Sequence, residues 1–209
     1  IRNTARFLLA NLDDFDPSKD LVDPSKMISL DKWIVSQAQK LQQEIVADYD
    51  EYSFHHIYQK IHNFCVNELG SFYLDVIKDR QYTCKTQSVA RRSCQTAMYY
   101  IIEALTRWLA PILSFTAEEI WKNIPGDRGE TVFLEIWYDK FPKLDMGAGA
   151  KDNTSSKSNA NMDDHFWQEV LIVRNAVNKV IEEKRNAGVL GSALEAEVSL
   201  YCNENLLDK

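Results

Sequence analysis

The chain has 209 residues, of which 45% are hydrophobic and 11% aromatic. This apolar content suffices for one or two ordinary cores and excludes a disordered polymer, while no apolar run in the chain approaches the roughly 18 residues that a membrane span needs. The net charge of −7 argues against a generic nucleic-acid coat, because non-specific binding depends on cationic side chains that neutralise phosphates.

The four cysteines, Cys65, Cys84, Cys94 and Cys202, form no C-x-x-C pair and are too few for a disulfide scaffold of this size. Their pattern favours reduced thiols in the cytoplasm over disulfides or structural zinc. No secretory signal is recognisable and no initiator Met precedes Ile1. We therefore expect a monomeric, cytoplasmic fragment of a longer protein.

Apolar residues recur at helical spacing in almost every long segment, which predicts an all-α fold. The first helix is expected to end near Leu12, before a turn at residues 13–17 whose proline cannot continue a helix. The second is predicted over about residues 30–50, with Ser29 as its N-cap and Trp33 on its apolar face.

The third helix is predicted to follow the cap Ser53. Its apolar stripe includes Phe54 and Tyr58, which are therefore expected on the buried side. We expect this helix to continue past Gly70, although a glycine costs about 1 kcal/mol in a helix.

A fourth helix, from about residue 87, has the broadest apolar face and is expected to kink or end at Pro111. A short fifth helix is predicted after Thr116, which with Glu119 forms a T-x-x-E capping box. Residues 131–138 are apolar and β-branched, so an extended segment laid over the bundle is predicted there.

The last third of the chain changes composition. Residues 143–161 consist mainly of Gly, Ala, Ser, Asn and Lys, which predicts a linker or mobile loop. A last helix is predicted over about residues 163–187, ending at Gly188, and the alternation in 196–201 is typical of a strand. The predicted domains are a helical bundle at 1–142, the linker or mobile insertion at 143–161, and the last bundle helix with the start of a truncated α/β junction domain at 162–209.

The densest basic segment runs over residues 78–92 and contains five cations against one acid. It spans the end of one predicted helix and the start of the next, with a tyrosine inside it. Such a segment offers guanidinium groups to phosphate and a ring on which an unpaired base can stack, although a solvated interhelical turn would have the same composition. Its candidate RNA-binding residues are Lys78, Arg80, Tyr82, Lys85, Arg91 and Arg92.

A second, weaker basic set lies on the last predicted helix. It is partly offset by Glu182 and Glu183, and most helices of this kind are ordinary surface helices. Its candidate RNA-binding residues are Arg174, Lys179 and Arg185, with Lys184 beside them.

The chain contains no recognisable catalytic signature. His55, His56 and His62 lack the spacing of a helical metal pair and have no third ligand nearby, so no metal site is expected. No Gly-rich nucleotide loop and no nucleophile motif occurs either. The fragment itself is therefore predicted to be non-catalytic and to bind no cofactor.

Four stretches carry a family resemblance: I-R-N-T-A-R-F-L-L at residues 1–9, G-S-F-Y-L-D-V-I-K-D-R at 70–80, A-R-R-S-C-Q-T at 90–96 and A-P-I-L-S-F-T-A-E-E-I-W at 110–121. In order and spacing they resemble the region after the catalytic domain of bacterial-type isoleucyl-tRNA synthetases. The last stretch is shared in outline with the valine and leucine enzymes, whereas the run ending in K-D-R points to isoleucine. The resemblance covers residues 1–138 and resumes with the last helix and residues 191–196.

The resemblance implies a helical bundle that receives the anticodon stem and loop of tRNA(Ile). It also implies that ATP, magnesium and zinc act in parts of the enzyme absent from this chain, so no catalytic role is carried over. Three alternatives stay open: a related valyl- or leucyl-type domain, a helical protein-interaction module, and a free-standing helical enzyme. The interaction module would not need the basic segment and would bind its partner at high salt, whereas the enzyme would need polar residues converging in a buried pocket.

Overall fold

The structure, a computed structural model, describes residues 1–144 and 164–201. The chain forms two compact units, residues 1–145 and 146–209. The described residues form helices and turns and contain no strand, which confirms the predicted all-α fold. The predicted linker at 143–161 lies almost entirely outside these residues. Within them, no helix is both long and apolar enough to cross a membrane.

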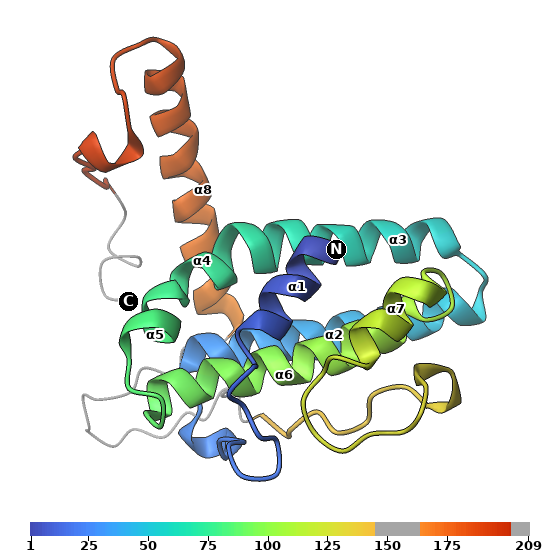
Figure 1. Cartoon of the computed structure of the whole chain (residues 1–209). Coiled ribbons are helices and arrows are strands. Elements are labelled where there is room, and N and C mark those ends of the chain that lie inside the picture. Colours follow the sequence, from blue (N-terminus) through green and yellow to red (C-terminus); the bar gives the residue numbers. More distant parts are fainter. Residues whose placement is uncertain (145–163, 202–209) are drawn as a thin grey trace, which may run out of the picture. The chain divides into compact units, whose positions relative to one another are not determined.

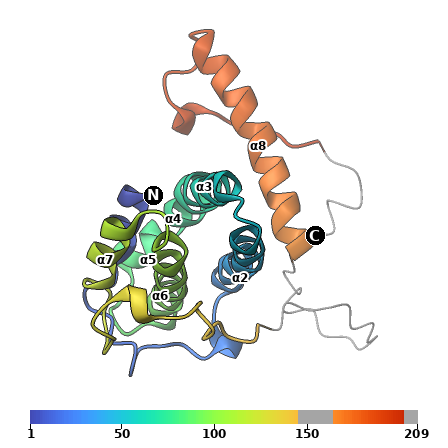
Figure 2. The ribbon, with the colours of Figure 1, turned by 90° about the vertical axis from the view of Figure 1, so that its right-hand side faces the viewer.

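The first unit is a bundle arranged around α6 (Val89–Leu109), which packs against α1, α2, α5 and α7 (Figure 1). Figure 2 shows α2, α3 and α6 nearly end-on, and α2 contacts both of the other helices. The other helices of this unit are α1 (Arg2–Ala10), α2 (Ser29–Asp50), α3 (Phe54–Asn63), α4 (Leu74–Val76), α5 (Lys78–Thr83) and α7 (Ser114–Trp121).

Helix α6 supplies most of the core because nearly all its positions from Arg92 onward are buried. The helix begins at a serine cap, where Ser88 Oγ accepts a hydrogen bond from the backbone N–H of Arg91. As predicted, it ends just before Pro111, which has no N–H to continue the ladder. Trp108 is fully buried, and burial of a side chain of this size is among the largest single hydrophobic contributions to stability.

The third predicted helix does continue through Gly70, but it changes geometry on the way. The α3 hydrogen-bond pattern ends at Asn63, and Phe64–Tyr73 is π-helical. A Cβ atom at position 70 would lie 2.9 Å from the backbone oxygen of Cys65, closer than a side chain tolerates. Glycine is therefore required by the close backbone approach in this wide turn.

Two details of α2 and α3 differ from the sequence-based predictions. Ser53 is the N-cap of α3 as predicted, but α2 has Ile28 at its N-cap and Ser29 as its first helical residue. Phe54 and Tyr58 were expected on the buried side, yet they are 47% and 55% exposed. Both lie in the first two turns of α3, where the helix extends to the edge of the bundle.

The predicted capping box of the fifth helix is wrong. Helix α7 begins at Ser114, so Thr116 lies inside its first turn. Glu119 instead forms an ion pair with Arg2 of α1, with Nη2 and Oε1 3.0 Å apart. A T-x-x-E sequence signals a helix start only where the preceding chain is not already helical, and here the turn after α6 passes directly into α7.

The segment at residues 131–138, predicted to be extended, is interrupted by a 3₁₀ turn at Val132–Leu134, while the flanking residues Thr131 and Glu135 have extended backbone. The hydroxyl of Thr131 donates to Glu118 Oε2 at 2.8 Å, and the same oxygen accepts from the backbone N–H of Val132 at 3.2 Å. These bonds hold the chain against α7 and satisfy its backbone locally, so a strand partner is not needed.

The second unit consists of α8 (Asp164–Asn186) and the segment that returns along it. Gly188 ends the helix with φ +70°, as predicted for a C-terminal glycine. The described residues 196–201 are not a strand, contrary to the alternation in their sequence, and follow a 3₁₀ turn at Ala193–Glu195. Apolar side chains of α8 and of residues 196–200 instead line a cavity of about 420 Å³.

Candidate nucleic-acid interface

The basic segment at residues 78–92 forms α5, a turn and the first residues of α6. Gln81 anchors α5 to α6, because its side chain is buried and Nε2 lies 2.7 Å from Cys94 Sγ. Lys78 and Tyr82 are four residues apart and therefore share one face of α5. Both are exposed, so the Lys78 ammonium group and the Tyr82 ring on this face are accessible to solvent.

Arg80 points into the bundle. Its Nη1 and Nη2 donate to the two oxygens of Asp31, each at 2.8 Å, and the Asp31 carboxylate is completely buried. The same carboxylate accepts hydrogen bonds from the hydroxyls of Tyr73, at 2.8 Å, and Ser93. Burial first, and the charge of Asp31 next, raise the pKa of Tyr73, which stays a neutral donor. Arg80 thus joins α5 to α2 and α6.

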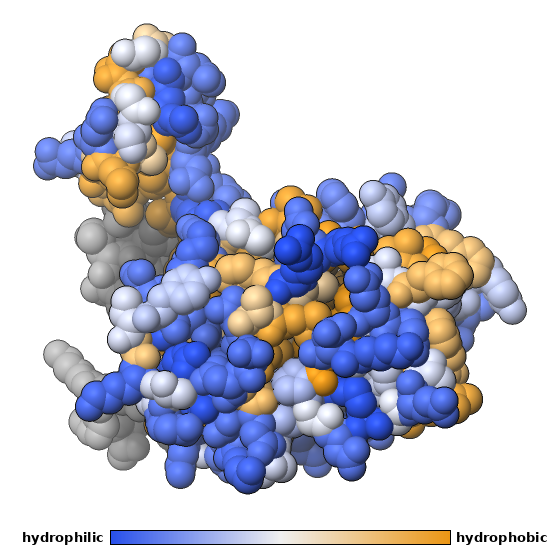
Figure 3. Space-filling model, viewed as in Figure 1, coloured by the Kyte–Doolittle hydropathy of each residue, from blue (hydrophilic) through white to orange (hydrophobic). Residues whose placement is uncertain are grey.

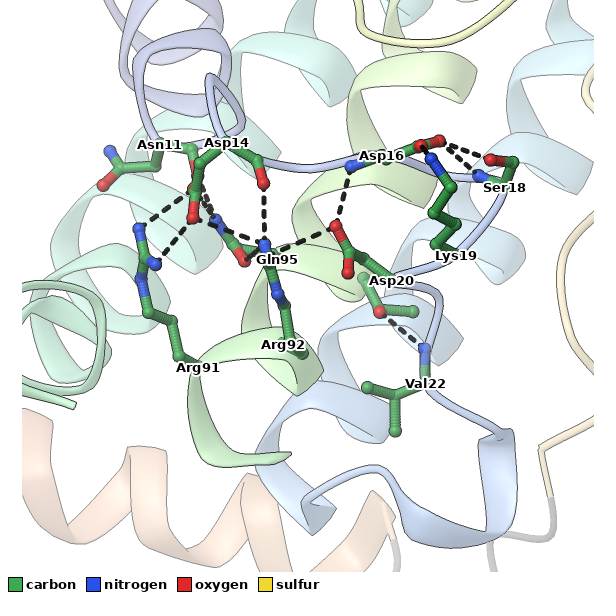
Figure 4. A network of polar contacts seen from close by, with 11 residues as sticks. Asn11, Asp14, Asp16, Ser18, Lys19, Asp20, Val22, Arg91, Arg92 and Gln95 are labelled. Carbon is green, nitrogen blue, oxygen red and sulfur yellow. Dashed lines mark hydrogen bonds and ion pairs between the residues drawn. The ribbon is translucent and has the colours of Figure 1, made fainter. Parts of the chain in front are cut away.

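Arg91 is held by the loop that follows α1 (Figure 4). Its Nη1 and Nη2 contact the two oxygens of Asp14 at 2.7 and 3.0 Å. Gln95 adds a third donor to that carboxylate, with Nε2 2.8 Å from Asp14 Oδ1. This bidentate geometry is typical of strong arginine–carboxylate pairs.

Arg92 lies beside this pair and is more deeply buried, with 6% of its side chain exposed. It donates to the backbone oxygen of Asp14 at 3.0 Å and to Gln95 Oε1 at 2.7 Å. Its Nη2 lies 3.3 Å from Asp20 Oδ2. Arg91 and Arg92 together fix the 11–22 loop to the beginning of α6, and their charges are balanced by that loop.

Three members of the basic segment therefore extend into solvent. Tyr82 is 67% exposed, and Lys85 in the following turn is exposed as well. Lys78 pairs with Asp75 at 2.7 Å, but half of its side chain is exposed, and surface pairs of this kind contribute little and exchange readily.

Residues 31–200 match the family described as the anticodon-binding domain of tRNA ligase. The chain belongs to this family. It is 54% identical over 209 residues to the isoleucine–tRNA ligases of Legionella pneumophila strain Lens and Pectobacterium atrosepticum, and 55% identical over 208 residues to that of Thioalkalivibrio sulfidiphilus. Each match covers 100% of this chain and 21% of the relative. The resemblance to isoleucyl-tRNA synthetases is thereby confirmed, and the chain spans about a fifth of their length.

In this anticodon-binding domain, the basic segment is divided into two groups. The guanidinium groups of Arg80, Arg91 and Arg92 hold the fold together, a role that the sequence analysis did not assign to them. Lys78, Tyr82 and Lys85 are directed outward. Contact with RNA stays a prediction for all six residues, but a phosphate at the three arginines would have to compete with carboxylates already in place.

The pairing of Asp14 predicts a pH dependence of the domain's stability. Partial burial opposes ionisation, but hydrogen bonds from Gln95 and Arg91, with the charges of Arg91 and Arg92, outweigh it and lower the pKa of Asp14. A lowered pKa in the folded state stabilises the fold above the unfolded value near 4, and this contribution is lost as pH falls through the folded pKa.

Asp14→Asn is therefore expected to destabilise the domain at pH 6, and the difference from the parent chain should shrink below about pH 4. Because a third of the Asp14 side chain is exposed, the effect should stay below about 1 kcal/mol. Urea unfolding at pH 6, 4 and 3 measures it, with Asp13→Asn as the neighbouring exposed control. A difference that persists unchanged at pH 3 would contradict this assignment.

The second basic set lies on α8 of the anticodon-binding domain. Arg185 is paired with Glu182 at 2.7 Å, and Arg174 also has interactions within the chain. Lys184 lines the apolar cavity of this unit, and Lys179 is exposed. Within the second unit, Lys179 is thus the member of the set that is best placed to meet an external phosphate.

Among the residues that the structure describes, no group of three His, Cys, Asp or Glu side chains could hold a metal ion. The rings of His55 and His56 lie 4.1 Å apart, and His56 Nδ1 lies 3.9 Å from Asp48 Oδ1.

Proposed function

We propose that this domain binds the anticodon stem and loop of tRNA(Ile) and positions that tRNA for ATP-dependent aminoacylation by other parts of an isoleucine–tRNA ligase. The observation that supports this most is the family match at residues 31–200, combined with 54% identity along the whole chain to ligases named for isoleucine. In this proposal ATP, magnesium and zinc act in those other parts. The ligase works in the cytoplasm as a monomer.

The outward face of α5 and the turn that follows it are the proposed site of RNA contact. Lys78 and Lys85 can each meet a phosphate, and Tyr82 between them offers a ring to an unpaired loop base. The chain as a whole carries a charge of −7, so phosphate is attracted at few places and repelled at many. Such a surface favours a defined orientation of the RNA over high affinity.

A titration with two stem-loops tests the proposal. The probes are an RNA hairpin with an isoleucine anticodon and the same hairpin with a changed anticodon, and fluorescence anisotropy measures binding to the 209-residue chain. We expect the matching hairpin to bind on the order of tenfold more tightly, because each misread base costs roughly 1–3 kcal/mol in sequence-specific recognition. Equal binding of both hairpins would contradict the proposal.

The same experiment separates the alternatives. A valyl- or leucyl-type domain would prefer hairpins with the corresponding anticodons. A protein-interaction module would bind none of them and would retain its partner at salt concentrations that release RNA. The exposed cations Lys78 and Lys85 favour the RNA-binding function, because a helical interaction groove does not need them.

A further inference from the structure

One end of the bundle exposes several large apolar side chains. This apolar end face lies where α2 passes into α3 and where α7 and the 3₁₀ turn Val132–Leu134 meet α6, and Figure 3 shows apolar side chains over α7 and this end of the bundle. Its most exposed members range from 47% to 95% exposure and are Tyr52, Phe54, Phe115, Phe133, Leu134 and Ile136. A cluster of exposed large apolar side chains is typical of an interaction site.

The apolar end face is continuous. The rings of Tyr52 and Phe54 lie 6.0 Å apart, Phe54 lies 6.0 Å from Tyr49, and Tyr49 lies 5.4 Å from Trp137. Trp137 in turn lines a cavity of about 440 Å³, together with Pro111, Phe133 and Ile136. A row of aromatic rings therefore leads into an open apolar cavity large enough for one or two side chains of a partner.

The cavity is held in a preformed shape. The Tyr49 hydroxyl donates to the backbone oxygen of Trp108 at 2.7 Å. Tyr49 lies beside the cavity, in ring contact with Trp137 of its lining. Within the lining, Arg107 Nε donates to the backbone oxygen of Ile136 at 3.0 Å and its Nη2 contacts Glu135 at 3.2 Å. A preformed surface binds its partner without a large ordering cost.

The charges around this face favour a polypeptide over RNA. Asp50 and Glu51 directly precede Tyr52 in the chain, and Glu130 and Asp139 flank the segment that contains the 3₁₀ turn; all four are exposed. Arg107, the cation of the cavity wall, is already neutralised by Glu103 and Glu135. The nearby Lys122 pairs with Glu118 at 3.3 Å, and Lys140 is adjacent to Asp139. Carboxylates thus outnumber unpaired cations, and phosphates would be repelled.

We propose that the apolar end face docks another domain of the same ligase polypeptide, through large apolar side chains that enter the cavity and basic groups that face the carboxylates. This inference rests on the proposed function, since the matched relatives extend far beyond this chain, which covers 21% of their length. An interface between protein domains usually has an apolar centre that is surrounded by a polar, charged rim.

Thiol labelling tests the proposal. Leu134, 80% exposed on the apolar end face, and Val89, 54% exposed at the opposite end of α6, are each replaced by cysteine in a background with Cys84→Ser and Cys202→Ser. Burial raises the pKa of the remaining thiols, to about 11 for Cys65 and about 12 for Cys94, so they contribute little background reaction. N-ethylmaleimide reacts with each variant in the 209-residue chain and in the complete ligase.

We expect Leu134→Cys to react at least tenfold more slowly in the complete ligase than in the 209-residue chain, and Val89→Cys to react at similar rates in both. Equal rates for Leu134→Cys, or equal slowing of both positions, would overturn the proposal. So would protection of Leu134→Cys in the 209-residue chain by the RNA hairpin, or by raised protein concentration, since these outcomes would assign the face to RNA or to a second copy. The hairpin titration fails or succeeds independently of these rates.

Discussion

Asp31→Ala is expected to lower the free energy of unfolding by about 3–5 kcal/mol, the range for removing one partner of a buried ion pair. The substitution would leave Arg80, with 18% of its side chain exposed, without its carboxylate. The hydroxyls of Tyr73 and Ser93 would lose their acceptor in the interior, and an unsatisfied buried donor carries a further desolvation cost. Because these partners belong to the π-helical segment, α5 and α6, α5 should lose its anchorage.

Urea unfolding followed by circular dichroism measures this loss. Asp79→Ala, an exposed carboxylate on α5, is the matched control and should change stability by less than about 0.5 kcal/mol. The double variant Asp31→Ala, Arg80→Met should recover part of the loss, because it removes the uncompensated buried charge. A loss below about 1 kcal/mol for Asp31→Ala would show that water reaches the site and that the pair is not structural.

Tyr82→Ala is expected to weaken binding of the matching anticodon hairpin by about 1–3 kcal/mol, the cost of one stacking ring, which corresponds to roughly 5- to 150-fold in affinity. The salt dependence should hardly change, since the ring carries no charge. Lys78→Ala and Lys85→Ala should behave differently, each reducing the slope of log K against log salt by about 0.7, the value for one phosphate on single-stranded RNA. If both lysines contact phosphates, they together contribute about 1.4 to the slope of log K against log salt in the unsubstituted chain.

Salt titrations of the three variants against the parent chain measure these effects. Tyr52→Ala is the control, because Tyr52 is also an exposed tyrosine, 77% accessible, but belongs to the apolar end face. Its affinity for the hairpin should be unchanged. Equal affinity and equal slope for all three variants would remove α5 and its following turn from the RNA site and favour the exposed Lys179 on α8.

Apolar spacing and capping residues in the sequence predicted the helices well. The apolar face of α6, the cap at Ser53 and the terminal Gly188 are each set by residues within one or two turns, which is the range over which helix signals act. The prediction failed at Thr116, because α7 already begins at Ser114. It also missed the 3₁₀ turn at Val132–Leu134, which depends on bonds from Glu118 that form only after the chain has folded.

For the candidate site, too, contacts between residues far apart in the sequence could not be predicted from the basic segment alone. Its composition correctly indicated a cationic turn with an exposed tyrosine, but it could not separate Lys78 from Arg80. That distinction depends on Asp31, 49 positions away, and on Asp14, 77 positions from Arg91. The apolar end face was likewise hidden from sequence reasoning, because an apolar residue such as Phe54 reads as core until its burial is known.

The π-helical segment Phe64–Tyr73 determines the direction, around the helix axis, in which the side chains of Tyr73 and of the following α5 point. Each of its wide turns holds one residue more than an α-turn, and one residue corresponds to about 100° around an α-helix. An uninterrupted α-helix through the same residues would therefore turn Tyr73 away from Asp31, and α5 would present a different set of side chains to solvent. Loss of a single residue near Gly70 would thus exchange the inward Arg80 and the outward Lys78 and Tyr82 without altering any of them chemically.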